Sequence, residues 1–243
     1  MKLVIIRHGD PNYEDDCLTV KGKDEAALLA QFVKDHIRPA AVYSSPLGRA
    51  KETCIASQKE CGFEFEVLDW MQEFNAYIFN PKERIPTYIW DLHPSLFVEH
   101  PLLYDSDHWM EDPLFEGSDT AEKFVKVKKG LETLLSKHGY ERIGESKLFR
   151  AVRSNRDVVV LYCHFGVLSI MMSILTGFSP YVFLQHFCAL PTSVTTIATE
   201  EREKGIVSFR CIGFGDLSHL ALGGEEASFA ARFCETFDSD EQH

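Results

Sequence analysis

The chain opens with a run of four apolar residues, Leu3–Ile6, that stops abruptly at Arg7, His8 and Gly9. Three of the four are β-branched. A short unbroken apolar run bounded by polar residues and glycine is typical of a buried strand. In open α/β sheets, ligand sites lie at the carboxyl ends of the strands. The polar residues that end this run are therefore candidates for a site, provided that other parts of the chain supply partners.

A second apolar run, Asp157–Cys163, ends in the same way at His164. It is the strongest strand pattern in the chain, and helical patterns alternate with strand patterns along the sequence. This alternation predicts an α/β fold with three layers, α/β/α, around a largely parallel central sheet. The carboxyl ends of both strands would then share one edge of the sheet, which places His8 near His164.

Periodicity and turn residues predict the remaining elements. We expect helices near 23–36, 47–60, 118–138, 165–176 and 180–186, and strands near 41–43, 63–68, 193–199 and 206–212. Ser45 and Pro46 have the form of a helix start, with Ser45 as the N-cap. Residues 140–156 predict a loop or an edge hairpin, and the acidic tail from about residue 235 is expected to be frayed.

Residues 74–117 interrupt this regular pattern. Five prolines, with aromatic residues between them, fit no single long element. A connection of this length inside a compact domain usually has a function or forms a small subdomain. We therefore expect residues 1–243 to form a single α/β domain that carries an irregular inserted lid at about 74–117.

The composition argues against several classes of protein. A formal net charge of −12 disfavours a general binder of nucleic acid or of an anionic membrane, because such a protein needs a basic face. No apolar run approaches the length of a membrane span, and the first strand is too short for a signal-peptide core. The seven cysteines include no Cys-x-x-Cys pair, which fits free thiols in a reducing compartment. We expect a cytoplasmic protein, and the sequence leaves the oligomeric state open.

Three motifs occur in order along the chain. They are a strand followed by Arg-His-Gly at 7–9, the string Ser-Ser-Pro-Leu-x-Arg-Ala-x-Glu-Thr at 44–53, and a strand followed by Cys-His-x-Gly at 163–166. In this order and spacing they resemble the histidine phosphatase superfamily, the phosphoglycerate-mutase-like group. The resemblance covers roughly residues 1–73 and 118–220 and leaves the insert uncovered. Each motif is weak alone, and the three together are a strong signal.

This resemblance implies a role for each polar residue at the strand ends. In this family the histidine of the Arg-His-Gly motif takes the phosphoryl group, so His8 is the expected nucleophile. Arg7, Arg49 and His164 would hold the charged oxygens of that group. Glu73 lies where the family places its general acid–base carboxylate, which would protonate the leaving oxygen and then activate water. The resemblance implies no metal and no cofactor, because these side chains supply the charge that Mg²⁺ gives elsewhere.

Five further residues are candidates for substrate contacts. Gly9 and Gly166 would let the backbone approach the ligand. Asn12 and Tyr13 lie in the loop after His8 and would line the phosphate pocket, with a plain turn as the alternative. Phe165 departs from the family pattern, which often has a small or polar residue here, and it would narrow the pocket.

The sequence also suggests two other chemistries, and both are disfavoured. Cys163 beside His164 hints at a cysteine phosphatase, but that class requires an arginine six residues after the cysteine, where this chain has Ser169. The insert holds three histidines among acidic residues, at positions 93, 100 and 108. Their irregular spacing fits a polar surface lid better than a metal site.

Two points about the chemistry stay open at this stage. Gln72, Asp69 and Glu66 lie close to Glu73 in sequence and are alternatives for its role. The second point is the choice between a phosphatase and a mutase. A phosphoglycerate mutase must hold a carboxylate and a second phosphate, which demands extra cations over the site.

The residues of the insert favour hydrolysis. The insert offers two cations against eight acids, and it contains nine aromatic residues: Phe74, Tyr77, Phe79, Tyr88, Trp90, Phe97, Tyr104, Trp109 and Phe115. Such a cover suits a less anionic, apolar or aromatic ester, although packing of a small subdomain also explains it. We expect a metal-independent, histidine acid phosphatase-like phosphomonoesterase with a small phosphorylated substrate. A phosphomutase and a non-catalytic phospho-ligand-binding protein are the alternatives.

Overall fold

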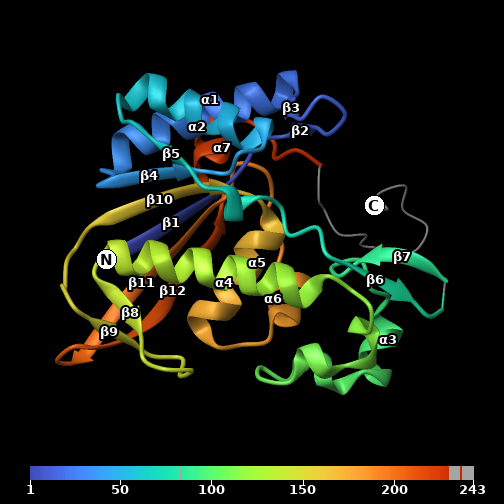
Figure 1. The fold of residues 1–243 in the computed structure, drawn as a ribbon. Helices are drawn as coiled ribbons and strands as arrows, with labels where there is room; N and C mark the ends of the chain where they lie inside the picture. Colours follow the sequence, from blue (N-terminus) through green and yellow to red (C-terminus); the bar gives the residue numbers. More distant parts are fainter. Residues whose placement is uncertain (83, 230–235, 237–243) are drawn as a thin grey trace.

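The computed structural model describes residues 1–82, 84–229 and 236 (Figure 1). The strands of its main sheet are β1 (Lys2–Arg7), β4 (Ala41–Ser44), β5 (Glu66–Val67), β8 (Tyr140–Arg142), β9 (Phe149–Ala151), β10 (Val158–Cys163), β11 (Val194–Glu203) and β12 (Ile206–Asp216). In space they follow the order β5-β4-β10-β1-β11-β12-β9-β8. The tail for which we expect fraying lies outside the described residues, Thr236 excepted.

Helices cover both faces of this sheet. They are α1 (Val20–His36), α2 (Gly48–Cys61), α4 (Thr120–Lys137), α5 (Phe165–Thr176), α6 (Pro180–His186) and α7 (Ser218–Gly223). Helices α1, α2 and α7 lie on one side, and α4, α5 and α6 lie on the other (Figure 1). This arrangement confirms the predicted α/β class. None of the helices described here combines the length and the apolar character that crossing a membrane requires.

The sheet is mixed, so the expectation of a largely parallel sheet is correct for only half of it. β1, β10, β4 and β5 pair in parallel, whereas β1 to β11, β11 to β12, β12 to β9 and β9 to β8 pair antiparallel. The connections explain the difference, since parallel neighbours need a long crossover and antiparallel neighbours need only a turn. A two-residue turn that ends at Gly205 joins β11 to β12. β8 and β9 form the edge hairpin that the sequence predicts.

The centre of the first strand, Leu3–Ile6, is apolar, which fits a sheet that is covered on both faces. Leu3 and Ile5 belong to the apolar cluster that includes residues of α4, α5 and α6, whereas Val4 and Ile6 belong to the cluster that includes residues of α1 and α2. All four are almost inaccessible to solvent. Full burial stabilises each such side chain by about 1.5–3 kcal/mol, so the strand that carries His8 is anchored in the centre of the core.

The insert divides into a hairpin and a compact helical part. The hairpin pairs β6 (Tyr77–Asn80) with β7 (Ile85–Tyr88), and the helical part holds α3 (Pro94–Glu99) and short 3₁₀ helices at Pro101–Tyr104, Trp109–Glu111 and Pro113–Phe115. Trp109 and Phe115 are buried and pack edge to face, and both rings contact Tyr181 of α6. Packing therefore accounts for some of the aromatic residues in the insert.

Two local predictions are wrong. Helix α2 begins at Gly48 instead of Pro46. The carboxylate of Asp16 accepts the Gly48 amide, and the hydroxyl of Ser45 accepts the amide of Leu47, which precedes the helix. The strand expected at 63–68 shortens to Glu66–Val67. The short helix α7 has no counterpart in the predicted elements. The six cysteines among the described residues are free thiols, as expected.

Candidate active site

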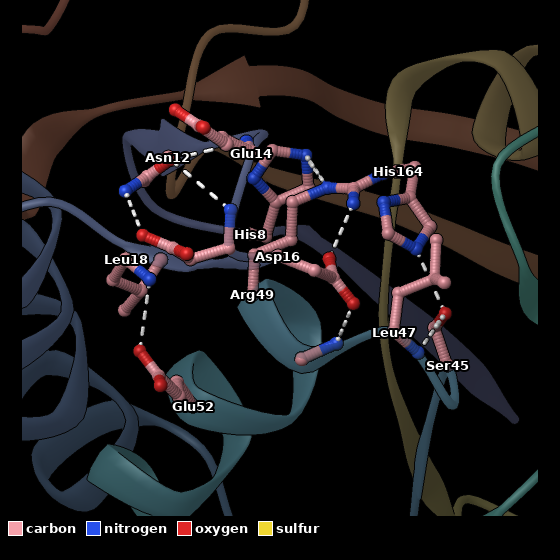
Figure 2. A network of polar contacts seen from close by, with 12 residues as sticks. His8, Asn12, Glu14, Asp16, Leu18, Ser45, Leu47, Arg49, Glu52 and His164 are labelled. Carbon is pink, nitrogen blue, oxygen red and sulfur yellow. Dashed lines mark hydrogen bonds and ion pairs between the residues drawn. The ribbon is translucent and has the colours of Figure 1, made fainter.

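The carboxyl ends of β1 and β10 bring His8 and His164 together. The two strands are parallel neighbours in which Arg7 is opposite Cys163, so the next residue of each strand projects from the same edge. The two imidazole rings have centroids 5.1 Å apart. Arg7 and Arg49 complete the cluster, and all four side chains are buried. Figure 2 shows His8, Arg49 and His164 grouped in this way.

The hydrogen bonds of His8 leave one ring nitrogen as a lone-pair acceptor. Nδ1 lies 2.7 Å from the carbonyl oxygen of Gly9, which can only accept, so Nδ1 carries the proton. Burial, followed by the charges of Arg7 and Arg49, holds the pKa of His8 well below its ordinary value, so the ring is neutral. Nε2 therefore has a free electron pair, and it accepts a hydrogen bond from Arg49 Nε at 3.3 Å.

His164 has the opposite arrangement. Its Nε2 lies 2.8 Å from Ser45 Oγ, and that hydroxyl accepts the backbone amide of Leu47 at 3.2 Å. Burial, then the neighbouring His8 and the arginines, keep the pKa of His164 well below its ordinary value. A neutral ring that accepts the Ser45 proton at Nε2 carries its own proton on Nδ1. The contacts thus favour a tautomer in which His164 is a donor at Nδ1.

Arg49 is held by an acid that the sequence analysis missed. Asp16 Oδ1 accepts from Arg49 Nη1 at 2.6 Å, and Asp16 Oδ2 accepts from Gly48 N at 2.6 Å (Figure 2). The carboxylate therefore caps α2 and orients the guanidinium whose Nε reaches His8. Tyr13 is 62% exposed, and its ring centroid lies 5.3 Å from Arg49 Cζ, a cation–π contact at the rim of the cluster.

Arg7 is fixed by backbone on the antiparallel side of β1. Its Nη1 donates to Ala189 O at 2.6 Å, and its amide donates to Ser193 O at 3.1 Å. Thr192, with a left-handed φ of 58°, donates its amide to His8 O at 3.0 Å. The segment before β11 therefore positions both residues of the Arg-His pair.

Two buried donors in this cluster lack a hydrogen-bond partner among the described residues. They are Nε of Arg7 and Nδ1 of His164. An unpaired buried donor costs about 1–3 kcal/mol, so such a pair is retained where a ligand supplies the acceptor. Two N–H donors, a second guanidinium and an uncharged imidazole nitrogen together form an environment suited to an anion with several oxygens.

The side chain of Glu73, which comes from the segment before β6, lies against the first turn of α5, beside this cluster. Its Oε1 accepts the amides of Phe74 at 2.7 Å and Val167 at 3.2 Å. A Cβ on Gly166 would lie 2.6 Å from the same oxygen, so the glycine permits the carboxylate to approach. Burial raises the pKa of Glu73 above its ordinary value, although the two amides and the arginines oppose this shift. These positions favour a carboxyl that can exchange a proton.

The alternatives to Glu73 lie elsewhere. Asp69 is exposed and forms an ion pair with Lys126, and Glu66 is exposed and forms one with Lys137. Gln72 donates to Asp69 Oδ1. Among these candidates it is Glu73 that the structure places beside Val167 and within the electrostatic influence of Arg7 and Arg49.

The remaining candidates shape the loops around the cluster. A Cβ on Gly9 would lie 2.7 Å from Gly22 O, so this glycine permits close packing on α1. Asn12 accepts the amides of Glu14 and Asp15 and thereby forms a turn within its own loop (Figure 2). Phe165 packs against the larger apolar cluster.

The structure also places the residues behind the two disfavoured chemistries. Cys163 is fully buried in β10, and burial raises the pKa of its thiol. In the insert, His100 pairs with Asp112 and His108 pairs with Asp105. Nowhere in the described part of the chain do three His, Cys, Asp or Glu side chains gather as metal ligands.

Comparison with known proteins agrees with the geometry. Residues 3–212 match the family model described as histidine phosphatase superfamily (branch 1). The chain belongs to this superfamily. The resemblance drawn from the three motifs is thus confirmed, and family membership supports a phosphatase or phosphomutase activity. No curated protein matches the chain.

Solved structures of phosphatases share its fold. A mutant phosphoserine phosphatase from Entamoeba histolytica in complex with phosphoserine superposes with a TM-score of 0.58 at 20% identity, covering 90% of this chain and 98% of that one. A mycobacterial glucosyl-3-phosphoglycerate phosphatase gives 0.57 at 17% identity, covering 88% and 98%. A putative alpha-ribazole-5'-P phosphatase from Escherichia coli gives 0.54 at 17% identity, covering 89% and 98%. The histidine phosphatase fold is therefore shared over nearly the whole chain.

The tautomer of His164 can be tested by removing its partner. In Ser45→Ala, the ring loses the hydroxyl that donates to Nε2, so we expect both neutral tautomers to be populated. We also expect the free energy of unfolding to fall by about 1–3 kcal/mol, because a buried polar atom loses its partner. Long-range ¹H–¹⁵N NMR of the imidazoles measures the first effect, and urea denaturation measures the second.

Ser44→Ala is the matched control, because the Ser44 hydroxyl is equally buried and donates to Ser45 O rather than to His164. It should leave the His164 resonances in place. A single Nδ1–H tautomer that persists in Ser45→Ala would contradict the assignment.

Proposed function

We propose that this histidine phosphatase superfamily member is a phosphomonoester hydrolase that works through a phosphohistidine on His8. The observation that carries the proposal is the pair of unpartnered buried donors, Arg7 Nε and His164 Nδ1, in the same cluster as the lone pair of His8 Nε2. A phosphoryl group supplies the missing acceptor oxygens and the electrophilic phosphorus. In this proposal no metal or cofactor takes part, because the guanidinium groups supply the positive charge.

The reaction proceeds in two displacements. The lone pair of His8 Nε2 forms a bond to phosphorus as the bond to the ester oxygen breaks, and the carboxyl of Glu73 gives its proton to that oxygen. Arg7, Arg49 and His164 hold the three phosphoryl oxygens as negative charge builds on them. Glu73, now a carboxylate, then takes a proton from water as the water oxygen attacks phosphorus, and the P–N bond breaks to return neutral His8.

Hydrolysis is favoured over phosphoryl transfer between two substrate positions by the charges around the site. A mutase needs cations for a second anionic group of its substrate. Two lysines, one in the insert and one on α4, are already engaged, since Lys82 pairs with Glu99 and Lys123 pairs with Asp119. Two structural neighbours are phosphatases by name, one of them bound to phosphoserine, which supports a small phosphorylated substrate.

A colorimetric assay tests the activity. We expect the enzyme to release p-nitrophenol from p-nitrophenyl phosphate in the presence of EDTA, and we expect His8→Ala to lose at least about 1,000-fold of kcat, because the covalent route is removed. His36→Ala replaces an exposed histidine on α1 and should retain full activity.

Two results would overturn the proposal. One is the absence of turnover on any phosphoester, which supports a non-catalytic binder. The other is robust interconversion of phosphoglycerates without release of inorganic phosphate, which supports a mutase.

The role of Glu73 is tested through the leaving group and through pH. Glu73→Gln cannot donate a proton, so kcat/KM for an alkyl phosphate, whose alkoxide leaves poorly, should fall by about 100- to 10,000-fold. The same variant should lose little kcat/KM on p-nitrophenyl phosphate. Because burial raises the pKa of Glu73, the wild-type kcat/KM for the alkyl ester should decline only as pH rises past that raised value. Glu73→Gln should lack this decline.

Glu66→Gln is the matched control, since Glu66 is exposed and paired with Lys137. It should behave as wild type with both esters. Equal losses of kcat/KM on the alkyl and nitrophenyl esters in Glu73→Gln would contradict a role in leaving-group protonation.

A further inference from the structure

The structure separates the aromatic residues of the insert into two groups. Trp109 and Phe115 are buried in the helical part, as described above. A second group, Tyr77, Tyr88 and Trp90, belongs to the hairpin β6–β7 and the turn that follows it, and this hairpin lies apart from the main sheet (Figure 1). Tyr77 is 39% exposed, and Tyr88 and Trp90 are partly exposed. Packing explains the first group. In the second group Trp90 packs against the larger apolar cluster, whereas Tyr77 and Tyr88 are not among the described residues of that cluster.

The second group forms a continuous stack. Tyr77 and Tyr88 are cross-strand partners, and their ring centroids lie 4.1 Å apart with an interplanar angle of 30°. Tyr88 and Trp90 lie 4.7 Å apart with an angle of 9°. Tyr77 and Tyr88 therefore share one face of the hairpin, and Trp90, in the turn that follows β7, continues the stack from Tyr88. We refer to Tyr77, Tyr88 and Trp90 as the aromatic stack.

The aromatic stack ends beside the proposed proton donor. A Cβ on Gly166 would lie 2.6 Å from Glu73 Oε1 and 2.9 Å from a carbon of the Trp90 indole, so the carboxyl and the indole adjoin the same point. A hydrogen bond with Tyr77, burial, and the negative charges of Tyr77, Asp91 and Glu73 raise the pKa of Tyr88 to about 12. Tyr88 therefore stays neutral, within the electrostatic reach of Glu73.

The charges near the aromatic stack disfavour an anionic ligand. The ionisable groups that act on Tyr88, Asp91 and Glu73 among them, are acidic. Lys82 follows β6 in the same hairpin. Its ammonium group donates to Ser95 and Glu99 of α3. Flat π faces without a cationic partner recognise neutral aromatic rings.

We propose that the aromatic stack is the leaving-group subsite and that the substrate is a phosphomonoester whose alcohol carries an uncharged aromatic ring. The inference rests on the proposed function, because Glu73 then protonates the ester oxygen that joins this ring to phosphorus. Trp90, next to Glu73, contacts the part of the alcohol nearest the ester bond, and Tyr88 and Tyr77 extend the surface outward. These residues determine specificity and take no part in the bond changes.

Two esters with matched leaving groups test this subsite. Benzyl phosphate and cyclohexylmethyl phosphate both release a primary alkoxide of similar basicity and size, and only the first carries an aromatic ring. We expect wild-type kcat/KM to be about two- to tenfold higher for benzyl phosphate, the range expected of one aromatic contact. In Trp90→Leu this preference should disappear through loss of activity on benzyl phosphate.

A control variant and an inhibitor pair separate recognition from structural damage. Tyr104→Leu alters a partly exposed ring of the insert that stacks on His186 of α6 instead of on the aromatic stack, and it should keep the wild-type preference. Benzylphosphonate should inhibit the wild-type enzyme more strongly than cyclohexylmethylphosphonate does. The two phosphonates should inhibit Trp90→Leu equally.

Three outcomes would contradict either the aromatic subsite or the phosphatase function on which it rests. Equal wild-type kcat/KM for the two esters would overturn the subsite while leaving the phosphatase intact. A uniform loss on both esters in Trp90→Leu would also overturn it, by showing that Trp90 acts only through the packing of Glu73. No hydrolysis of either ester, or of p-nitrophenyl phosphate, would instead reject the proposed function itself.

Discussion

The structure depends on keeping one imidazole buried, neutral and oriented between two guanidinium groups. The carbonyl of Gly9 fixes the proton of His8 on Nδ1, and the arginines oppose any further protonation. A charged His8 in this position would lack both solvent and an acidic partner, so burial and charge favour the nucleophilic form together. The cost is a concentration of positive charge in the core, which Asp16 offsets at Arg49 and which an anionic ligand would offset further.

The parts of this arrangement that follow from local patterns could be predicted from the sequence. Two apolar runs that end in histidine predict β1 and β10 and the meeting of His8 with His164. Asp16 could not be found in this way. It lies in a loop, its own backbone has a left-handed φ of 49°, and no periodicity marks its position or its contact with Arg49. Ser45 is expected as a helix cap, and its hydroxyl does accept the local amide of Leu47, but its tertiary contact with His164 cannot be predicted from the local sequence. The antiparallel half of the sheet was missed because strand periodicity carries no direction.

The insert shows why a family pattern does not extend to specificity. The motifs that resemble the superfamily lie at the ends of β1 and β10 and at the start of α2, where the proposed phosphoryl group would bind. Residues 74–117 lie outside the motifs, and their aromatic content has two explanations that composition cannot separate. Ring geometry separates them, since Trp109 packs on Tyr181 of α6 whereas Trp90 stacks on Tyr88 beside Glu73. In the proposed account, the phosphoryl chemistry and the choice of ester therefore reside in different elements.

The central claim is that His8 Nε2 receives the phosphoryl group, and trapping that intermediate tests it most directly. The enzyme is mixed with a ³²P-labelled phosphomonoester, quenched in alkali during turnover, digested and mapped by mass spectrometry. We predict a label that survives alkali, is lost in acid and lies on the peptide that contains His8, with the phosphate on Nε2. Steady turnover with no label on His8, or with a label on another residue, would contradict the account.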